Sequence, residues 1–135
     1  MSYYFSTKIA GTFDDVIGRT RQALKTQGFG IISEIDIQAA LREKIGVDFR
    51  RYTILGACNP ALALEALQIE DKVGTMLPCN VVVQEQGDCI EVAAIDPVAS
   101  MQAIENRQLS EKAAVVAERL KAAIETLRLP VEAIG

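Results

Sequence analysis

Two cysteines in similar short contexts are the residues of this sequence with the clearest capacity for chemistry. Cys58 lies in the stretch LGACNP and Cys79 in the stretch LPCN, and each directly precedes an asparagine. Thiolates are nucleophiles and ligands of soft metal ions, so the pair indicates a small-molecule site or a soft-ion site such as one for Cu(I). The alternative is structural, because free cysteine is among the residue types most often buried in protein cores.

The residues after Cys58 predict the start of a helix. Asn59 is a favoured N-cap and Pro60 a favoured first-turn residue, so we expect a helix over residues 60–68. The positive end of a helix stabilises a thiolate placed beside it. The candidate ligand-binding residues are the two cysteines and the asparagine after each: Cys58, Asn59, Cys79 and Asn80. Cys58 and Cys79 are also the candidate metal ligands, whereas Asn80 is alternatively a turn residue that binds the backbone.

The composition of the chain disfavours several kinds of site. The sequence contains no histidine, so it lacks the usual general base and imidazole metal ligands. It contains no CxxC pair, which disfavours a thioredoxin-type redox site and a zinc ribbon. The third cysteine, Cys89, follows a predicted turn and is expected to be a packing or edge residue. Thiol–disulfide or persulfide chemistry centred on Cys58 is the catalytic alternative.

Length and charge predict an ordinary soluble protein. A chain of 135 residues, half of them hydrophobic, is long enough for one domain with a real core. The odd count of three cysteines and the absence of a signal-peptide pattern predict a cytoplasmic protein with reduced thiols. A net charge of −4 disfavours a nucleic-acid partner. No apolar run reaches the roughly 18 residues that a membrane span needs, so we expect no membrane partner.

Alternating and helical hydrophobic patterns predict the elements that position the two cysteines. Strands are expected at residues 3–10, 29–37 and 50–58, and a hairpin within 79–95 turns around Gly87. Helices are expected at residues 12–28, 37–44 with Leu41 and Ile45 inward, 60–68, and 110–127 with Ser110 as its N-cap. Residues 70–77 are expected to form a connection, and Asp96 and Pro97 to begin a short turn or helix.

The resulting order, β-α-β-α-β-α-β-β-α, predicts an α+β fold with one mainly antiparallel five-stranded sheet and helices packed on one face. Residues 1–130 form a single domain in this interpretation, and residues 131–135 a flexible C-terminal tail. The direction of the strand that begins at Cys79 is open. Antiparallel pairing with the strand that ends at Cys58 would make the two cysteines neighbours, and a parallel crossover would separate them.

The stretches LGACNPALALEAL and VGTMLPCNVVVQE resemble the family known as domain of unknown function 302. The resemblance extends over nearly the whole chain. It implies a curved antiparallel sheet of the TATA-binding-protein-like type, assembly as a homodimer, and a shared site for Cys58 and Cys79. It implies no established activity and no DNA binding, since a fold does not determine a function.

The leading hypothesis is therefore a small, soluble, non-enzymatic binding protein, assembled as a homodimer, with a site for a small ligand or soft metal centred on Cys58 and Cys79. One alternative is a thiol-dependent redox or persulfide-handling enzyme that uses Cys58. The other is a purely structural homodimeric module, in which both cysteines serve only packing.

Overall fold

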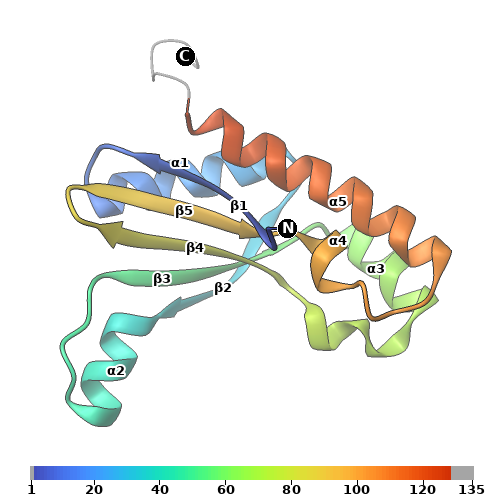
Figure 1. Cartoon of the computed structure of the whole chain (residues 1–135), viewed down its shortest axis with the longest axis horizontal. Helices are drawn as coiled ribbons and strands as arrows, with labels where there is room; N and C mark the ends of the chain where they lie inside the picture. The colour runs from blue at the N-terminus through green and yellow to red at the C-terminus, as the bar shows by residue number, and fades with distance from the viewer. Residues whose placement is uncertain (1, 129–135) are drawn as a thin grey trace.

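The five strands form one open sheet in the order β1-β5-β4-β3-β2, and every neighbouring pair is antiparallel (Figure 1). A computed structural model describes residues 2–128 of the chain. The strands are β1 (Tyr4–Ile9), β2 (Gly30–Asp36), β3 (Tyr52–Cys58), β4 (Cys79–Gln86) and β5 (Cys89–Ile95). The predicted α+β class, element order and antiparallel sheet are confirmed. The expected tail at residues 131–135 lies outside the described part.

The hairpin between β4 and β5 turns at Gly87 and Asp88, within the turn predicted around Gln86, Gly87 and Asp88. Gly87 has a φ of +63°, and only glycines have positive φ among the described residues. Glycine at the first central position of such a turn matches the twist of the two flanking strands. The turn thereby sets the register in which Gln86 lies opposite Cys89.

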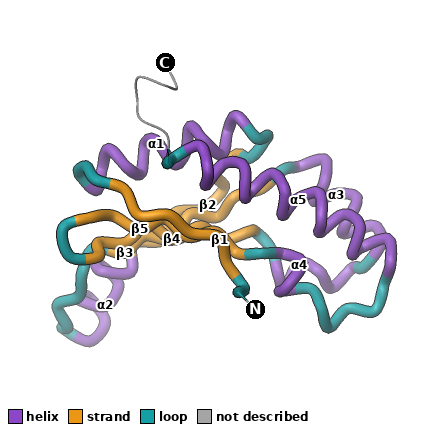
Figure 2. The backbone as a smooth tube through the Cα atoms, turned by 45° about the horizontal axis from the view of Figure 1, so that its top comes forward, coloured by secondary structure: helices purple, strands orange, loops and turns teal. Residues whose placement is uncertain are grey.

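The two long helices, α1 (Phe13–Thr26) and α5 (Arg107–Thr126), lie side by side on one face of the sheet (Figure 2). Their apolar stripes pack on the inward side chains of the central strands. This first core cluster is made of buried residues, and its fully buried members include Val16, Leu24, Leu55, Val81, Val92 and Leu120. Thr12 caps α1 as predicted, because its side chain accepts a hydrogen bond from the N–H of Asp15 at 3.1 Å.

Helix α5 begins one turn earlier than predicted. Its N-cap is Asn106, whose side chain accepts a hydrogen bond from the N–H of Leu109 at 3.1 Å. Ser110, the predicted cap, lies inside the helix, where its hydroxyl donates to the carbonyl of Asn106 at 3.1 Å. Asparagine and serine cap about equally well, so the prediction failed because it chose the later of two suitable residues.

Helix α2 (Ile37–Ile45) lies on the other side of the strands from α1 and α5, as both ribbon views show (Figures 1 and 2). None of its residues is buried, and Ile45 is 67% exposed, so the expectation that Ile45 faces inward is wrong. The prediction assumed that an apolar stripe must meet the core. The main contacts of α2 with another element are to β3, whose first residues pair with the end of β2 just before the helix.

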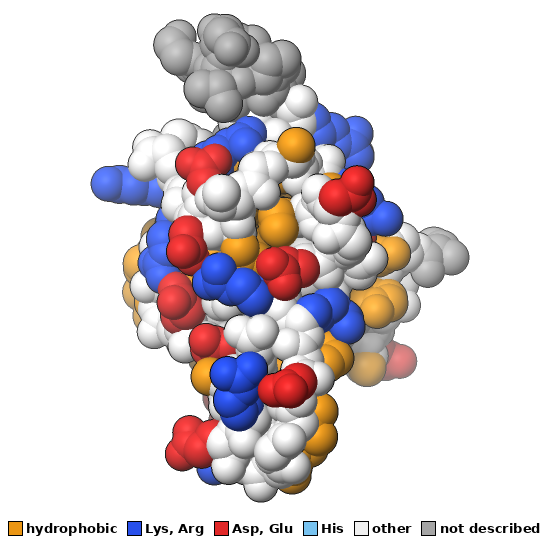
Figure 3. Space-filling view, turned by 90° about the vertical axis from the view of Figure 1, so that its left-hand side faces the viewer, with side chains coloured by type: hydrophobic (Ala, Val, Ile, Leu, Met, Phe, Trp, Pro, Cys, Tyr) orange, Lys and Arg blue, Asp and Glu red, His pale blue; other side chains and the backbone are white. Residues whose placement is uncertain are grey.

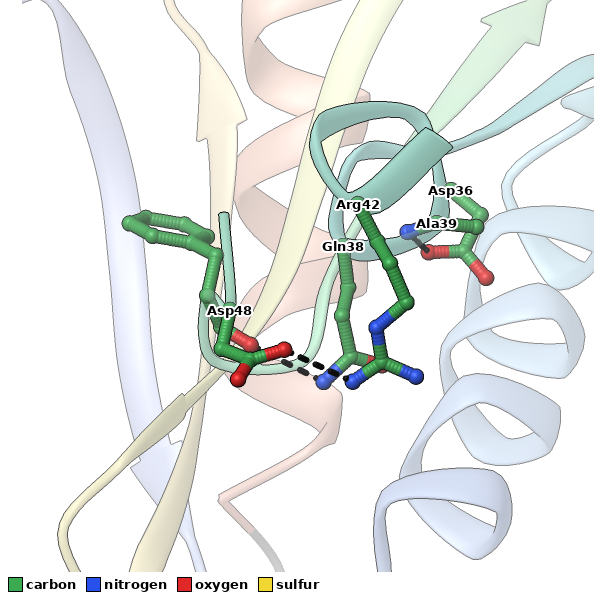
Figure 4. A network of polar contacts seen from close by, with 6 residues as sticks. Asp36, Gln38, Ala39, Arg42 and Asp48 are labelled. Atoms are coloured by element: carbon green, nitrogen blue, oxygen red, sulfur yellow. Dashed lines mark hydrogen bonds and ion pairs between the residues drawn. The ribbon is translucent and has the colours of Figure 1, made fainter. Parts of the chain in front are cut away.

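Polar contacts define α2 and its return segment (Figure 4). Asp36 is the predicted N-cap, and its side chain accepts a hydrogen bond from the N–H of Ala39 at 3.0 Å. Gln38 donates through Nε2 to the carbonyl of Phe49 at 2.9 Å, and Arg42 forms an ion pair with Asp48 at 3.2 Å. These contacts hold the returning chain against the helix.

Three short helices build a second core at one end of the sheet. They are α3 (Pro60–Ile69), the 3₁₀ helix η1 (Asp71–Met76), which lies inside the connection expected at residues 70–77, and α4 (Pro97–Ser100). Together with the first half of α5 they bury the second core cluster: Ala66, Val73, Met101, Leu109 and Ala113. Helix α5 is therefore the element that contributes buried residues to both clusters.

The surface carries charges of both signs. Figure 3, turned to show the left-hand side of Figure 1, shows Lys and Arg interspersed with Asp and Glu. Arg51 pairs with Asp14 at 2.9 Å, and its guanidinium lies 4.2 Å from the ring centre of Phe13. The absence of a nucleic-acid partner stays a prediction. No helix within residues 2–128 combines the length and the apolar character needed to cross a membrane.

Candidate functional site

The antiparallel pairing of β3 and β4 brings Cys58 and Cys79 to the same edge of the sheet. Ala57 lies directly opposite Cys79 in the register, and Cys58 is the next residue of β3. Both cysteines line the same cavity, and both are free thiols. The structure thus resolves the direction of β4, which the sequence left open.

The residues after Cys58 form the predicted helix start. Asn59 is the N-cap of α3: its Oδ1 accepts a hydrogen bond from the N–H of Leu62 at 3.2 Å, and Pro60 occupies the first turn. Asn59 also lines the cavity and lies against Gly28. A Cβ atom at Gly28 would lie 2.9 Å from the Asn59 Nδ2. Asn59 is therefore held between two elements, and its backbone role accounts for its place beside Cys58.

The LPC segment is positioned by a close approach to β3. Gly56 has no side chain, and a Cβ atom there would lie 2.7 Å from the Pro78 Cγ and too close to the Ser33 hydroxyl. Pro78 therefore packs directly on the backbone of β3, one residue before Cys79. Pro78 thus contacts β3 just before β4 begins, and the Cys79 side chain that follows it lies in the first core cluster.

The cavity that both cysteines line, which we call the thiol pocket, has a volume of about 320 Å³. It lies between the two core clusters. Phe29, Ala57 and Cys79 of the first cluster form one side, and Met101, Leu109 and Ala113 of the second form the other. Two lining residues are well exposed, Ile32 at 65% and Leu67 at 41%, so the pocket opens to solvent through an apolar rim.

Burial controls the ionisation of Cys79. The residue is only 6% exposed, and its pKa is raised from 9.0 to about 11, first by loss of solvent and then by the nearby charge of Cys58. Burial disfavours the thiolate because an apolar environment solvates a charge poorly. Cys79 is therefore a neutral thiol at pH 7, whereas Cys58 is half-buried at the open end of α3.

The structure does not bring Asn80 to the thiol pocket. Asn80 is exposed and lines a separate hollow with Tyr3, Tyr52 and Gln84 on the sheet face that α1 and α5 leave open. Successive side chains of a strand point to opposite faces of the sheet. Because the Cys79 side chain points toward the core, the Asn80 side chain points away from it. Cys89 lies in the hairpin, where its thiol donates to the carbonyl of Gln86 at 3.3 Å.

One charged residue of the pocket wall was missed from the sequence. Lys112 of α5 lines the thiol pocket together with Leu109, Ala113 and Val116 on the same helix. The available signal was its spacing: a residue three after Leu109 and four before Val116 lies beside the apolar stripe of the helix. The prediction of this helix used only its apolar positions, so the charged residue beside them was overlooked.

The donor set for a metal is small. Within residues 2–128, no group of three or more His, Cys, Asp or Glu side chains is placed to hold an ion. Cys58 and Cys79 offer two sulfur donors, and binding through both would require Cys79 to release its proton against a raised pKa. The pocket is better equipped for an apolar molecule, because most of its lining is aliphatic.

Comparisons with known proteins agree with one another. A crystal structure of an uncharacterized conserved DUF302 protein from Bacillus stearothermophilus superimposes with a TM-score of 0.88 and 28% sequence identity, and the match covers 95% of this chain and 100% of that chain. A search among curated proteins gave no match. The model of the family described as domain of unknown function DUF302 matches residues 5–127, nearly the whole chain. The chain therefore belongs to the DUF302 family.

Proposed function

We propose that this protein binds a small, mainly apolar molecule in the thiol pocket. The observation that supports the proposal is the gap of about 320 Å³ between the two core clusters. Protein interiors are normally packed as densely as organic crystals. The side chains that line an apolar gap lack van der Waals contacts on that side unless a molecule fills the gap. Ligand pockets have this character: a concave, mostly apolar wall with a few polar groups.

The polar groups of the pocket have distinct parts in this proposal. Cys79 is a neutral thiol deep in the wall and contributes soft, polarisable contact area. Cys58 and Asn59 lie where α3 begins, so an electron-rich group of the ligand would meet the positive end of that helix. The role that we propose is one of binding: the sequence contains no histidine, and no carboxylate residue is among the lining residues within the described part of the chain.

A pocket-filling variant tests the proposal. Ala63 of α3 lines the pocket, so Ala63→Phe places a ring in the gap, whereas Leu64→Phe places the same ring on the exposed side of α3. We expect small neutral aliphatic and aromatic probes to raise the melting temperature of the wild type and of Leu64→Phe, but not of Ala63→Phe. A ligand at a hundred times its Kd stabilises by about 2.7 kcal/mol. Equal responses of all three proteins would contradict the proposal.

A soft-metal site is the second candidate, because two thiols lie together on neighbouring strands. Two thiolates suit Cu(I), which accepts low coordination by sulfur. Anaerobic competition against a coloured Cu(I) chelator tests it, with Cys58→Ser and Cys79→Ser as the decisive variants and Cys89→Ser as the control. Retention of one equivalent of Cu(I) by both decisive variants would count against a shared site.

The homodimer and the cytoplasmic location that we expect from the sequence remain proposals. Helix α2 supports assembly, because a helix of nine residues with none buried is marginally stable by itself. A second copy of the chain is the partner that the family resemblance implies. Light scattering at micromolar concentration tests this, and a monomeric mass throughout the range would refute the dimer.

A further inference from the structure

The wall of the thiol pocket contains a single charged side chain among the described residues, Lys112. Lys112 extends from α5 next to the lining residues Leu109, Ala113 and Val116. Lysine in such a position lays its aliphatic stem along the apolar wall and keeps its ammonium group at the solvent boundary. The pocket therefore has an apolar body and, in its wall, one residue with a positively charged side chain.

The partner of this charge lies outside the pocket. Glu65 of α3 contacts the Lys112 ammonium through Oε2 at 3.1 Å, and Glu65 itself is not part of the pocket wall. Both side chains are substantially exposed, at 38% for Lys112 and 47% for Glu65. An ion pair with this exposure contributes little and is screened by salt, so its carboxylate is replaceable.

We propose that the ligand class of the thiol pocket is a monocarboxylate with an unbranched or compact apolar tail. The carboxylate of the ligand binds the Lys112 ammonium, either in place of the Glu65 carboxylate or together with it. The apolar tail of the ligand fills the gap between the core clusters. This inference rests on the proposed binding function. An ammonium group presents three donors and no acceptor, so an anionic oxygen matches it and a neutral head group matches it less well.

The size of the pocket sets the length of the tail. Its volume of about 320 Å³ is roughly twice that of an apolar cavity of about 150 Å³ that binds benzene, which corresponds to about ten to twelve heavy atoms. Octanoate has this size, and 1-octanol has the same tail with a neutral head. The two compounds form a matched pair that separates recognition of the charge from burial of the chain.

The experiment measures the affinities of octanoate and 1-octanol at pH 7 by calorimetry, with the intact wild-type chain and its variants. We expect octanoate to bind the wild type about tenfold more tightly than octanol, as one charge-assisted hydrogen bond provides. Lys112→Met should remove this preference by weakening octanoate binding to the level of octanol binding in the same variant. Glu65→Gln should strengthen octanoate binding severalfold, because it removes the competing carboxylate.

Controls separate recognition from folding. Lys121→Met removes a lysine from the exposed side of the same helix and should keep the octanoate preference. Lys112→Arg keeps the positive charge and should retain most of the preference, and circular dichroism reports whether each variant is folded. Added salt should weaken octanoate binding and not octanol binding.

The results that would overturn the carboxylate inference differ from the result that would overturn the proposed binding function. Equal affinity of octanoate and octanol in the wild type, or an unchanged preference in folded Lys112→Met, overturns the carboxylate inference and leaves the apolar pocket standing. Failure of both compounds to bind the wild type at millimolar concentration, together with failure of the neutral probes, overturns the proposed function and the inference with it.

Discussion

Pro78 packs on the backbone of β3 at Gly56, so closely that a Cβ atom on Gly56 would lie 2.7 Å from the Pro78 Cγ. This contact holds the start of β4 against the end of β3 and thereby places Cys79 beside the last residues of β3. The position of the second thiol depends on a residue without a side chain on the neighbouring strand. The consequence is testable by adding one methyl group.

We expect Gly56→Ala to lower the free energy of unfolding by about 1 to 3 kcal/mol, because the added methyl group overpacks the contact with Pro78 and the Ser33 hydroxyl. Gly30→Ala is the matched control: Gly30 also lies in a strand, and a methyl group added there would have open space within 4 Å. Urea denaturation measures both. Similar unfolding free energies of the two variants would show that β4 moves away from the added methyl group without loss of stability.

Gly28 offers a second paired comparison. Gly28 and Gly46 both have left-handed backbones, with φ of +86° and +66°, so alanine is strained at each. At Gly28 the new methyl group would also press on the Asn59 side chain, 2.9 Å away, whereas Gly46 has open space. We therefore expect Gly28→Ala to destabilise the protein by roughly 1 kcal/mol more than Gly46→Ala, through loss of the α3 cap.

Thermal melts and urea titrations compare the two alanine variants, and Asn59→Ala supplies the reference for losing the cap. In an Asn59→Ala background the difference between Gly28→Ala and Gly46→Ala should shrink, because the pressed side chain is gone. A difference of the same size in both backgrounds would mean that Asn59 is not the residue through which Gly28 acts.

The raised pKa of Cys79 predicts a loss of stability at alkaline pH. The folded protein binds this proton up to about pH 11, whereas the thiol has an ordinary pKa of 9.0 in the unfolded chain. The stabilisation that the folded protein gains from holding the Cys79 proton is thus complete below pH 9 and is lost as the pH rises toward 11. Each pKa unit corresponds to about 1.36 kcal/mol, so the wild type should lose about 2 kcal/mol more than Cys79→Ala between about pH 8.5 and 10.5.

Urea titrations of the wild type and of Cys79→Ala across this pH range measure the difference in unfolding free energy. The two proteins share every other titrating group, so the difference reports on Cys79 alone. Cys89→Ala, which removes a half-buried thiol of the hairpin, is the control for the loss of a thiol elsewhere in the chain. Parallel pH profiles for the wild type and Cys79→Ala would refute a raised pKa at this residue.

The two pocket thiols should differ in reactivity. Cys58 is half-buried, whereas Cys79 is 6% exposed and holds its proton to about pH 11. Because the thiolate is the reactive form, we expect a small alkylating reagent at pH 8 to modify Cys58 at least about tenfold faster than Cys79. Mass spectrometry of a Cys89→Ser variant measures both rates, and faster modification of Cys79 would contradict the described burial.

Local sequence rules predicted what depends on neighbouring residues. The caps at Thr12, Asp36 and Asn59 and the turn at Gly87 were all confirmed, because each is determined within a few residues of chain. The start of α5 was wrong, since Asn106 and Ser110 both satisfy the same rule. Alternation along β4 was sufficient to separate Asn80 from Cys79, although the sequence interpretation grouped them.

Long-range features of the site were not accessible from the sequence. The direction of β4 depends on how α3 and η1 return the chain, and length alone permitted either direction. The pocket is formed by the meeting of two core clusters from segments far apart in the chain, so no local pattern records it. Lys112 becomes informative only once α5 is known to border that gap.

The gap between the clusters also predicts two units of the molecule that open with different free energies. Leu120 and Ile124 anchor the second half of α5 in the larger cluster, whereas Leu109 and Ala113 anchor its first half in the smaller one. Side chains on opposite walls of the gap do not pack on one another, so we expect the smaller unit to open at a lower free energy than the whole. Amide hydrogens of α3 and of the first half of α5 should therefore exchange faster than those near Leu120, and a bound molecule should make the two rates converge.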